Sequence, residues 1–202
     1  MIAPAMTLRA ASRQDAAAMT DLVNFAGEGM PLYLWSGMAT GGQSPWEIGR
    51  ERAMRESGGF SYRNTTVCER SGRIAGALIG YPLDPEPDPD STRDMPPMFV
   101  PLQELEDLAA GTWYVNVLAA SPEYRGMGVG TQLLMAADDH AARAGNIGLS
   151  IIVSDANTDA RRLYERQGYI ELASRPIVKD GWDTDGKNWV LLVKDRSADK
   201  RR

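Results

Sequence analysis

The stretch Tyr124-Arg125-Gly126-Met127-Gly128-Val129-Gly130-Thr131 places three alternating glycines between a strand-like run and a helical run. Glycine has no Cβ, so its main chain can approach a ligand closely. The start of a helix offers unpaired N–H groups and a positive dipole end to an anion. We therefore predict that this loop binds phosphate groups. A tight turn from strand to helix is the alternative interpretation of the same glycines.

Two common phosphate-binding patterns do not fit this loop. The dinucleotide fingerprint G-x-G-x-x-G requires a third glycine where this chain has Thr131. The nucleotide P-loop requires Gly-Lys-Ser or Gly-Lys-Thr, which occurs nowhere in the sequence. The loop does match Arg/Gln-x-x-Gly-x-Gly/Ala at Arg125, Gly128 and Gly130. That pattern is too short to decide a function by itself, so the surrounding elements matter.

The elements around the loop alternate between strand and helix. A strand is expected before it at 113–119, and a helix after it ends at Gly145. One face of this helix is formed by Val129, Leu133, Ala136, Ala137, His140 and Ala144. A buried strand at 149–153, a helix at 157–167 and strands within 169–178 and 189–194 follow. This order predicts a βαβαβ-like core.

The N-terminal half adds antiparallel strands and further helices. We expect a strand at 6–10, a helix from Ser12 to Gly27, an aromatic loop at 31–42 and a second helix from Ser44 to about Ser57. The runs 65–70 and 73–83 form a hairpin. Residues 82–101 are rich in proline and acidic residues, and a short helix at 102–109 follows, so 82–110 is predicted to be an insertion or lid. The fold class is mixed α/β with a partly antiparallel, partly parallel sheet.

Composition limits the classes of function. The 202 residues fit a single domain spanning 1–202. A net charge of −5 argues against a nucleic-acid partner, and the basic cluster Lys194–Arg202 is interpreted as a solvated tail. One cysteine, Cys68, excludes an intramolecular disulfide and a multi-cysteine metal site. No apolar run approaches the roughly 18 to 20 residues of a membrane span, so we expect a cytoplasmic protein with no membrane partner.

Two segments resemble the GNAT superfamily of acetyl-CoA-dependent N-acetyltransferases. Tyr114–Gly130 (YVNVLAASPEYRGMGVG) is similar to the family's central strand, proline turn and pyrophosphate loop. Asn157–Tyr169 (NTDARRLYERQGY) resembles its Asn-x-x-Ala-x-x-Leu-Tyr-x-x-x-Gly-Phe/Tyr helix. Both segments occur in the family's order, about 30 residues apart. The resemblance is sharp over roughly 112–170, and it implies a GNAT-like sheet whose parallel central strands splay at the coenzyme site.

The resemblance implies a direct transfer of the acetyl group of acetyl-CoA to a primary amine, with no metal. The amides of Met127, Gly128, Val129, Gly130 and Thr131 would surround the pyrophosphate, and Arg125 would position the loop or meet a phosphate. The main chains of Val117 and Ala119 would bind the coenzyme arm like an added strand and polarise the thioester carbonyl.

Tyr164 is the candidate general acid. It follows Ala160 by four residues and Asn157 by seven, which places all three on one helix face that would address the coenzyme. An ordinary phenol is protonated at pH 7 and can donate to a departing thiolate. Without the flanking motif, a core tyrosine would be the better interpretation.

No general base is assigned from the sequence. Asn116 on the central strand cannot take a proton but could orient a water or the amine. Glu123 is expected at the surface, and Tyr114 is a weaker candidate. His140 and Cys68 are expected to be packing residues.

The acceptor is predicted only as an amine. Its site could involve Tyr33, Trp35 and Trp46 as aromatic walls and acidic residues that attract an ammonium group: Glu28, Asp84, Glu86, Asp88 and Asp90. A hydrophobic staple and a solvated acidic loop explain these residues equally well. Two other functions stay open: a non-catalytic acyl-CoA-binding regulatory module on the same fold, and a different nucleotide-phosphate binder. The sequence also leaves open whether the chain forms a homodimer.

Overall fold

The computed structural model describes residues 5–196. The tail at 197–202, which holds most of the predicted basic cluster, lies outside the described residues. The chain divides into two compact units, whose described parts are 5–80 with 116–135, and 81–115 with 136–196. We call them the first and second unit. The prediction of one domain with an insertion at 82–110 stays a prediction.

The first unit contains an antiparallel sheet. Strand β1 (Met6–Ala10) pairs with β2 (Thr65–Arg70), and β2 pairs with β3 (Arg73–Pro82). Ser71 and Gly72 form the predicted hairpin turn, and both adopt a positive φ. The predicted first strand and hairpin are therefore confirmed, with β3 ending one residue earlier than expected.

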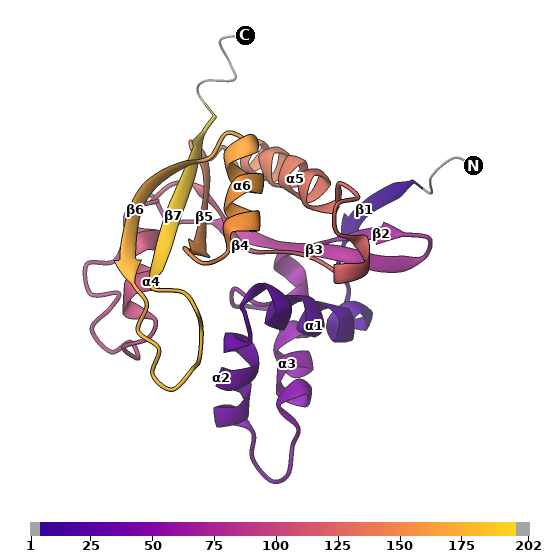
Figure 1. Ribbon diagram of the computed structural model, residues 1–202, viewed down its shortest axis with the longest axis horizontal. Coiled ribbons are helices and arrows are strands. Elements are labelled where there is room, and N and C mark those ends of the chain that lie inside the picture. The colour runs from indigo at the N-terminus through magenta and orange to yellow at the C-terminus, as the bar shows by residue number, and fades with distance from the viewer. Residues whose placement is uncertain (1–4, 197–202) are drawn as a thin grey trace. The chain divides into compact units, whose positions relative to one another are not determined.

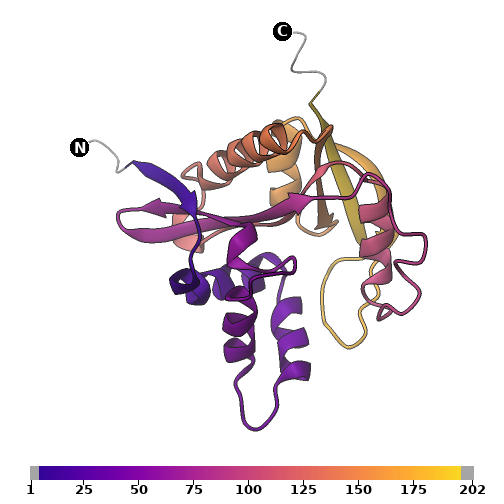
Figure 2. The ribbon, with the colours of Figure 1, turned by 180° about the vertical axis from the view of Figure 1, so that it is seen from behind.

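The first unit also contains helices α1 (Ala16–Ala26), α2 (Met30–Met38) and α3 (Pro45–Ala53), and α2 and α3 lie side by side (Figures 1 and 2). Ser44 caps α3 with a full capping box, as its Ser-Pro start predicts. The expected loop at 31–42 is wrong, because most of it forms α2. Gly29 at φ 83° caps α2, and Pro31 occupies a first-turn position that needs no N–H acceptor.

The core of the first unit lies between these helices and the sheet. Trp35 of α2 is 3% exposed and stacks on Phe60, with ring centroids 6.0 Å apart. The ring of Trp46 on α3 packs edge to face with the Trp35 ring, with centroids 6.3 Å apart. These contacts join residues 11 and 25 positions apart, so the sequence pattern of 31–42 alone could not indicate a helix.

The second unit holds three further strand pairs. Residues Trp113–Val115 of β4 (Trp113–Ala120) pair in parallel with Leu149–Ile151 of β5 (Gly148–Ser154), connected through α5 (Val129–Ala144). Strand β7 (Asn188–Asp195) is antiparallel to both β5 and β6 (Ile170–Pro176). The βαβαβ-like expectation therefore holds for β4–α5–β5 and is wrong beyond it, because β7 lies between β5 and β6.

The full strand order is β1-β2-β3-β4-β5-β7-β6 in one seven-stranded sheet. Its pairs are antiparallel and parallel in the mixture that the sequence predicts. Helix α4 (Val100–Asp107) contacts β6 and β7, and α6 (Thr158–Arg166) connects β5 to β6 (Figure 1). In the described part of the chain, no helix is long and apolar enough to cross a membrane.

Candidate functional site

The glycine loop of the first unit has the backbone conformation of an anion-binding turn. Gly126 and Gly128 have φ of 72° and 87°, a region that side-chain-bearing residues rarely adopt. The Gln132 N–H donates to the Gly128 carbonyl at 3.0 Å, which starts the hydrogen bonding of α5. In such a helix the amides from Gly128 to Thr131 have no acceptor within the helix. The Met127 amide donates to Tyr124 O at 3.3 Å, so it belongs to the turn instead.

Side chains from other elements of the first unit surround this loop. The guanidinium of Arg125 lies 4.7 Å from the ring centroid of Phe25, which holds it by a cation–π contact. Arg70, at the end of β2, approaches the Met127 sulfur at 2.6 Å. Two cations therefore flank the glycines. Phe25 and Arg70 were not identified from the sequence, since both are far from the loop along the chain.

Gly76 of β3 permits close packing beneath the loop. A Cβ on this residue would lie 2.5 Å from the Ala119 carbonyl oxygen and 2.6 Å from a Val129 methyl group. Val129 is 1% exposed and starts α5, while Ala119 is 4% exposed near the end of β4. The end of β4 and the first turn of α5 therefore both pack directly against Gly76, which has no side chain.

The predicted main-chain partners lie on the part of β4 that belongs to the first unit. Val117 is partly buried and packs against two core clusters, one of which includes Ala119. The pairing described between β4 and β5 covers Trp113–Val115, and both residues follow it along the strand. Asn116, between the paired stretch and Val117, is partly exposed.

The second predicted segment forms α6 in the second unit. Asn157 does not lie within the helix but caps it, because its side-chain oxygen accepts from the Ala160 amide at 3.3 Å. This is a physical reason for asparagine at the start of the motif. Tyr164 is 4% exposed and its ring lies 5.9 Å from that of Tyr169. Burial raises the pKa of the Tyr164 hydroxyl above its usual value, so the phenol is protonated at neutral pH.

His140 and Cys68 have the packing surroundings that the sequence indicates. His140 stacks on Trp113 at 5.5 Å with nearly parallel rings. Burial, together with the charge of Arg143, lowers its pKa. Cys68 is fully buried in β2, and burial raises the pKa of its thiol.

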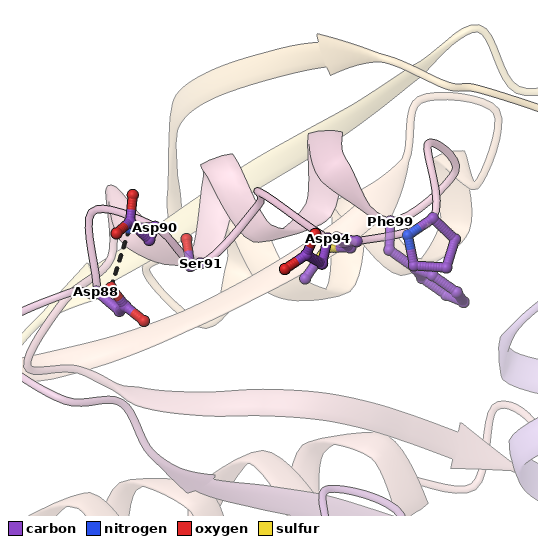
Figure 3. A pocket seen from close by; sticks show the side chains of 7 residues that line it. Asp88, Asp90, Ser91, Asp94 and Phe99 are labelled. Carbon is purple, nitrogen blue, oxygen red and sulfur yellow. Dashed lines mark hydrogen bonds between the residues drawn. The ribbon is translucent and has the colours of Figure 1, made fainter.

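The two ends of the segment 82–110 are joined by backbone hydrogen bonds, and its middle part is open to solvent. The Leu83 amide donates to Thr112 O at 2.9 Å, and the Gly111 amide donates to Asp84 O at 3.2 Å, so the ends of the segment meet. Its tip forms an open pocket of about 480 Å³ lined by Asp88, Asp90, Ser91, Asp94, Met95, Pro96 and Phe99 (Figure 3). Asp90 is also paired with Arg93 at 2.5 Å. Of the predicted acidic acceptor residues, Asp88 and Asp90 therefore line one pocket.

One acidic residue of the second unit is half-buried beside tyrosines and was not identified from the sequence. Glu106 of α4 accepts a hydrogen bond from the hydroxyl of Tyr114, and burial raises the pKa of its carboxyl to about 7. Tyr114 in turn contacts Tyr81 edge to face, with centroids 5.7 Å apart. Nothing in the sequence separates Glu106 from the other acidic residues at 84–107.

Comparison with known proteins supports the architecture and gives the family. The family model described as "Acetyltransferase (GNAT) family" matches residues 32–169, more than half of the chain. The chain belongs to the acetyltransferase (GNAT) family. No curated protein matches its sequence.

Solved structures of acetyltransferases share this fold along almost the whole chain. A crystal structure described only as an acetyltransferase has a TM-score of 0.65 and 20% identity, covering 94% of this chain and 98% of its own. An N-acetyltransferase from Staphylococcus aureus Mu50 has a TM-score of 0.62 and 18% identity, with 93% and 99% covered. A polyamine N-acetyltransferase from Drosophila melanogaster, which forms N-acetylagmatine, has a TM-score of 0.61 and 17% identity. The match covers 95% of this chain and 100% of that chain. At these identities the likeness concerns the GNAT fold alone.

Proposed function

We propose that this GNAT protein is an N-acetyltransferase that transfers the acetyl group of acetyl-CoA directly to a primary amine. The observation that carries the proposal is the loop before α5, where Gly126 and Gly128 adopt positive φ and the first helical amides face outward from the helix start. That conformation suits a pyrophosphate, and acetyl-CoA is the donor that this family implies.

The proposed binding roles follow the residues of the loop and β4. The amides of Gly128 to Thr131 bind the pyrophosphate, and Arg125, held by Phe25, adds positive charge. The main chains of Val117 and Ala119 hydrogen-bond the amide-bearing arm, and Asn157 and Ala160 at the start of α6 complete the set of coenzyme residues. Met127 contributes through its place in the turn.

The proposed chemical roles concern a proton and a carbonyl. The backbone of β4 polarises the thioester carbonyl, and Asn116 orients the amine or a water. Tyr164 donates its proton to the sulfur as the carbon–sulfur bond breaks. The phenol is protonated throughout the physiological pH range, as a proton donor must be.

Isothermal titration of the purified protein with acetyl-CoA, ATP and NAD tests the coenzyme. Heat of binding is expected with acetyl-CoA and not with the two nucleotides. Binding of ATP or NAD without acetyl-CoA would instead support another nucleotide-phosphate binder. Acetyl-CoA binding without thiol release across a broad amine panel would support the non-catalytic acyl-CoA-binding module.

A further inference from the structure

One end of the sheet formed by β1, β2 and β3 carries a row of side chains from all three strands. Met6 pairs with Arg70 across β1 and β2, and Arg70 pairs with Arg73 across β2 and β3. Side chains of directly opposite residues in an antiparallel pair lie on the same face of the sheet. Met6, Arg70 and Arg73 are therefore neighbours on one face.

Two members of this row reach the glycine loop directly. The Arg70 guanidinium contacts the sulfur of Met127, and the methyl carbon of Met6 lies 3.8 Å from the position that a Cβ on Gly128 would occupy. All four residues belong to the first unit. Arg70 is partly exposed and Met127 is 47% exposed, so an anion can reach the guanidinium from solvent. The guanidinium thus lies beside the loop that is proposed to bind the coenzyme.

The positive charges of this row are unequally compensated. Like charges directly opposite each other in an antiparallel pair are destabilising, and Arg70 and Arg73 form such a pair. Arg73 has an ion pair with Glu123 at 3.2 Å. Among residues 5–196, no carboxylate forms an ion pair with Arg70, which contacts the uncharged thioether of Met127. A thioether is a weak acceptor, which leaves most of the guanidinium N–H donors for an anion.

We propose that Arg70 is a coenzyme-binding residue that holds a phosphate group beside the glycine loop. This inference rests on the proposed N-acetyltransferase activity and adds a cation that lies outside the Arg-x-x-Gly-x-Gly pattern. Two groups of coenzyme A offer the required chemistry: the pyrophosphate and the monoester phosphate on the ribose. The planar guanidinium can donate two parallel hydrogen bonds to either of them. The competing explanation is an arginine that only covers the loop, and it predicts no effect on coenzyme affinity.

The test is isothermal titration of wild type and Arg70→Gln with acetyl-CoA and with acetyl-dephospho-CoA, which lacks the ribose phosphate. We expect the acetyl-CoA Kd of Arg70→Gln to rise about 10- to 100-fold, because a charge-assisted hydrogen bond is lost. The affinity of the variant should also depend less steeply on salt concentration, because one ionic contact is missing.

The second ligand identifies the phosphate group. If Arg70 holds the ribose phosphate, wild type binds acetyl-dephospho-CoA more weakly than acetyl-CoA, and Arg70→Gln causes no further loss with the dephosphorylated ligand. If Arg70 holds the pyrophosphate, Arg70→Gln weakens the binding of both ligands by the same factor. Either result supports the proposal.

Arg63→Gln is the matched control, because it removes the same charge beside the other end of β2. The Arg63 side chain is 61% exposed and forms an ion pair with Glu56. This variant should keep the wild-type affinity for both ligands. Arg70→Gln itself should unfold at a urea concentration no lower than wild type, because it removes one of two opposed arginines. Lost affinity in that variant therefore cannot be assigned to unfolding.

Two results would overturn the inference, and they differ in what they leave standing. An acetyl-CoA Kd of Arg70→Gln within about twofold of wild type would overturn the role of Arg70 and leave the proposed activity intact. A wild-type protein that binds neither ligand would overturn the proposed coenzyme site itself, and the role of Arg70 with it.

Discussion

At the scale of single residues, the environment of a side chain decides which chemistry it can perform. Tyr164 is buried and Glu106 is half-buried, and the loss of water around each side chain disfavours its charged form. The phenol of Tyr164, which would be protonated at pH 7 even when exposed, therefore keeps its proton. For the carboxyl of Glu106 the same effect raises the pKa to about 7. The same physical effect thus keeps both groups protonated up to a higher pH than in the unfolded chain.

Replacing Tyr164 by Phe tests the acid. We expect kcat to fall about 100-fold, because the hydroxyl acts mainly in the transition state, while the acetyl-CoA Kd stays near wild type. Tyr169→Phe is the control, because Tyr169 is as deeply buried as Tyr164 and its ring packs against the Tyr164 ring. Steady-state kinetics measure kcat, and calorimetry measures the acetyl-CoA Kd. Unchanged turnover in Tyr164→Phe would remove this residue from the acid role.

The Glu106 carboxyl should also be visible in the pH dependence of stability. Its ordinary pKa of 4.5 applies to the unfolded chain and about 7 to the folded one, so the unfolded state releases the proton first as pH rises. The free energy of unfolding of wild type should therefore decrease, relative to Glu106→Gln, between pH 4.5 and 7, and the difference should be constant above this range. We expect a total of about 1 to 3 kcal/mol. Denaturant titrations at a series of pH values measure it, and parallel curves for the two proteins would contradict a raised pKa.

At the scale of elements, the start of α5 is the feature on which the proposed coenzyme binding depends. Gly128→Val places a β-branched side chain where φ is 87° and where the phosphate is expected to approach. We expect acetyl-CoA binding to be lost. Gly72→Val is the matched control, because Gly72 has φ 74° in the β2–β3 turn, with open space around it.

Both variants should lose a similar amount of stability, on the order of 1 to 3 kcal/mol, from the same backbone strain. Titration calorimetry with acetyl-CoA, at a temperature where both variants are folded, separates a loss of coenzyme affinity from a loss of stability caused by backbone strain. Equal acetyl-CoA affinity in the two variants would mean that the glycine loop does not hold the coenzyme.

The sequence predicts elements well where the determining signals are local. Ser44-Pro45 marks the start of α3, Gly145 follows the end of α5, and the two glycines before α5 fix its turn. It fails where distant residues decide. Helix α2 depends on Trp35 packing against Phe60 and Trp46, and β7 takes its place beside β5 by pairing across more than thirty residues.

The same distinction between local signals and distant contacts explains which residues of the candidate site could be identified from the sequence. The motif residues Arg125 to Thr131 and Asn157 to Tyr164 are contiguous runs, so a sequence pattern can identify them. Phe25 and Arg70 reach the loop from other elements, and Glu106 is distinguished only by burial and by Tyr114. None of these three has a local signal, because their roles arise from tertiary contacts.

At the scale of the whole molecule, the residues assigned to the coenzyme occur in both compact units. The glycine loop and Val117 belong to the first, and Asn157 and Tyr164 to the second. If all of them serve one coenzyme, acetyl-CoA should slow amide hydrogen exchange at the start of α5 and at the start of α6 in the same titration. Protection confined to one of these helices would restrict the coenzyme contacts to one unit.

The central claim is that the chain transfers an acetyl group to an amine, and free-thiol release tests it most directly. Purified protein with acetyl-CoA and each member of a panel of primary amines should release thiol at a rate that depends on both substrates, with one acetylated amine formed per thiol. A protein that releases no thiol above the amine-free background with any member of a broad panel, although it binds acetyl-CoA, would contradict it.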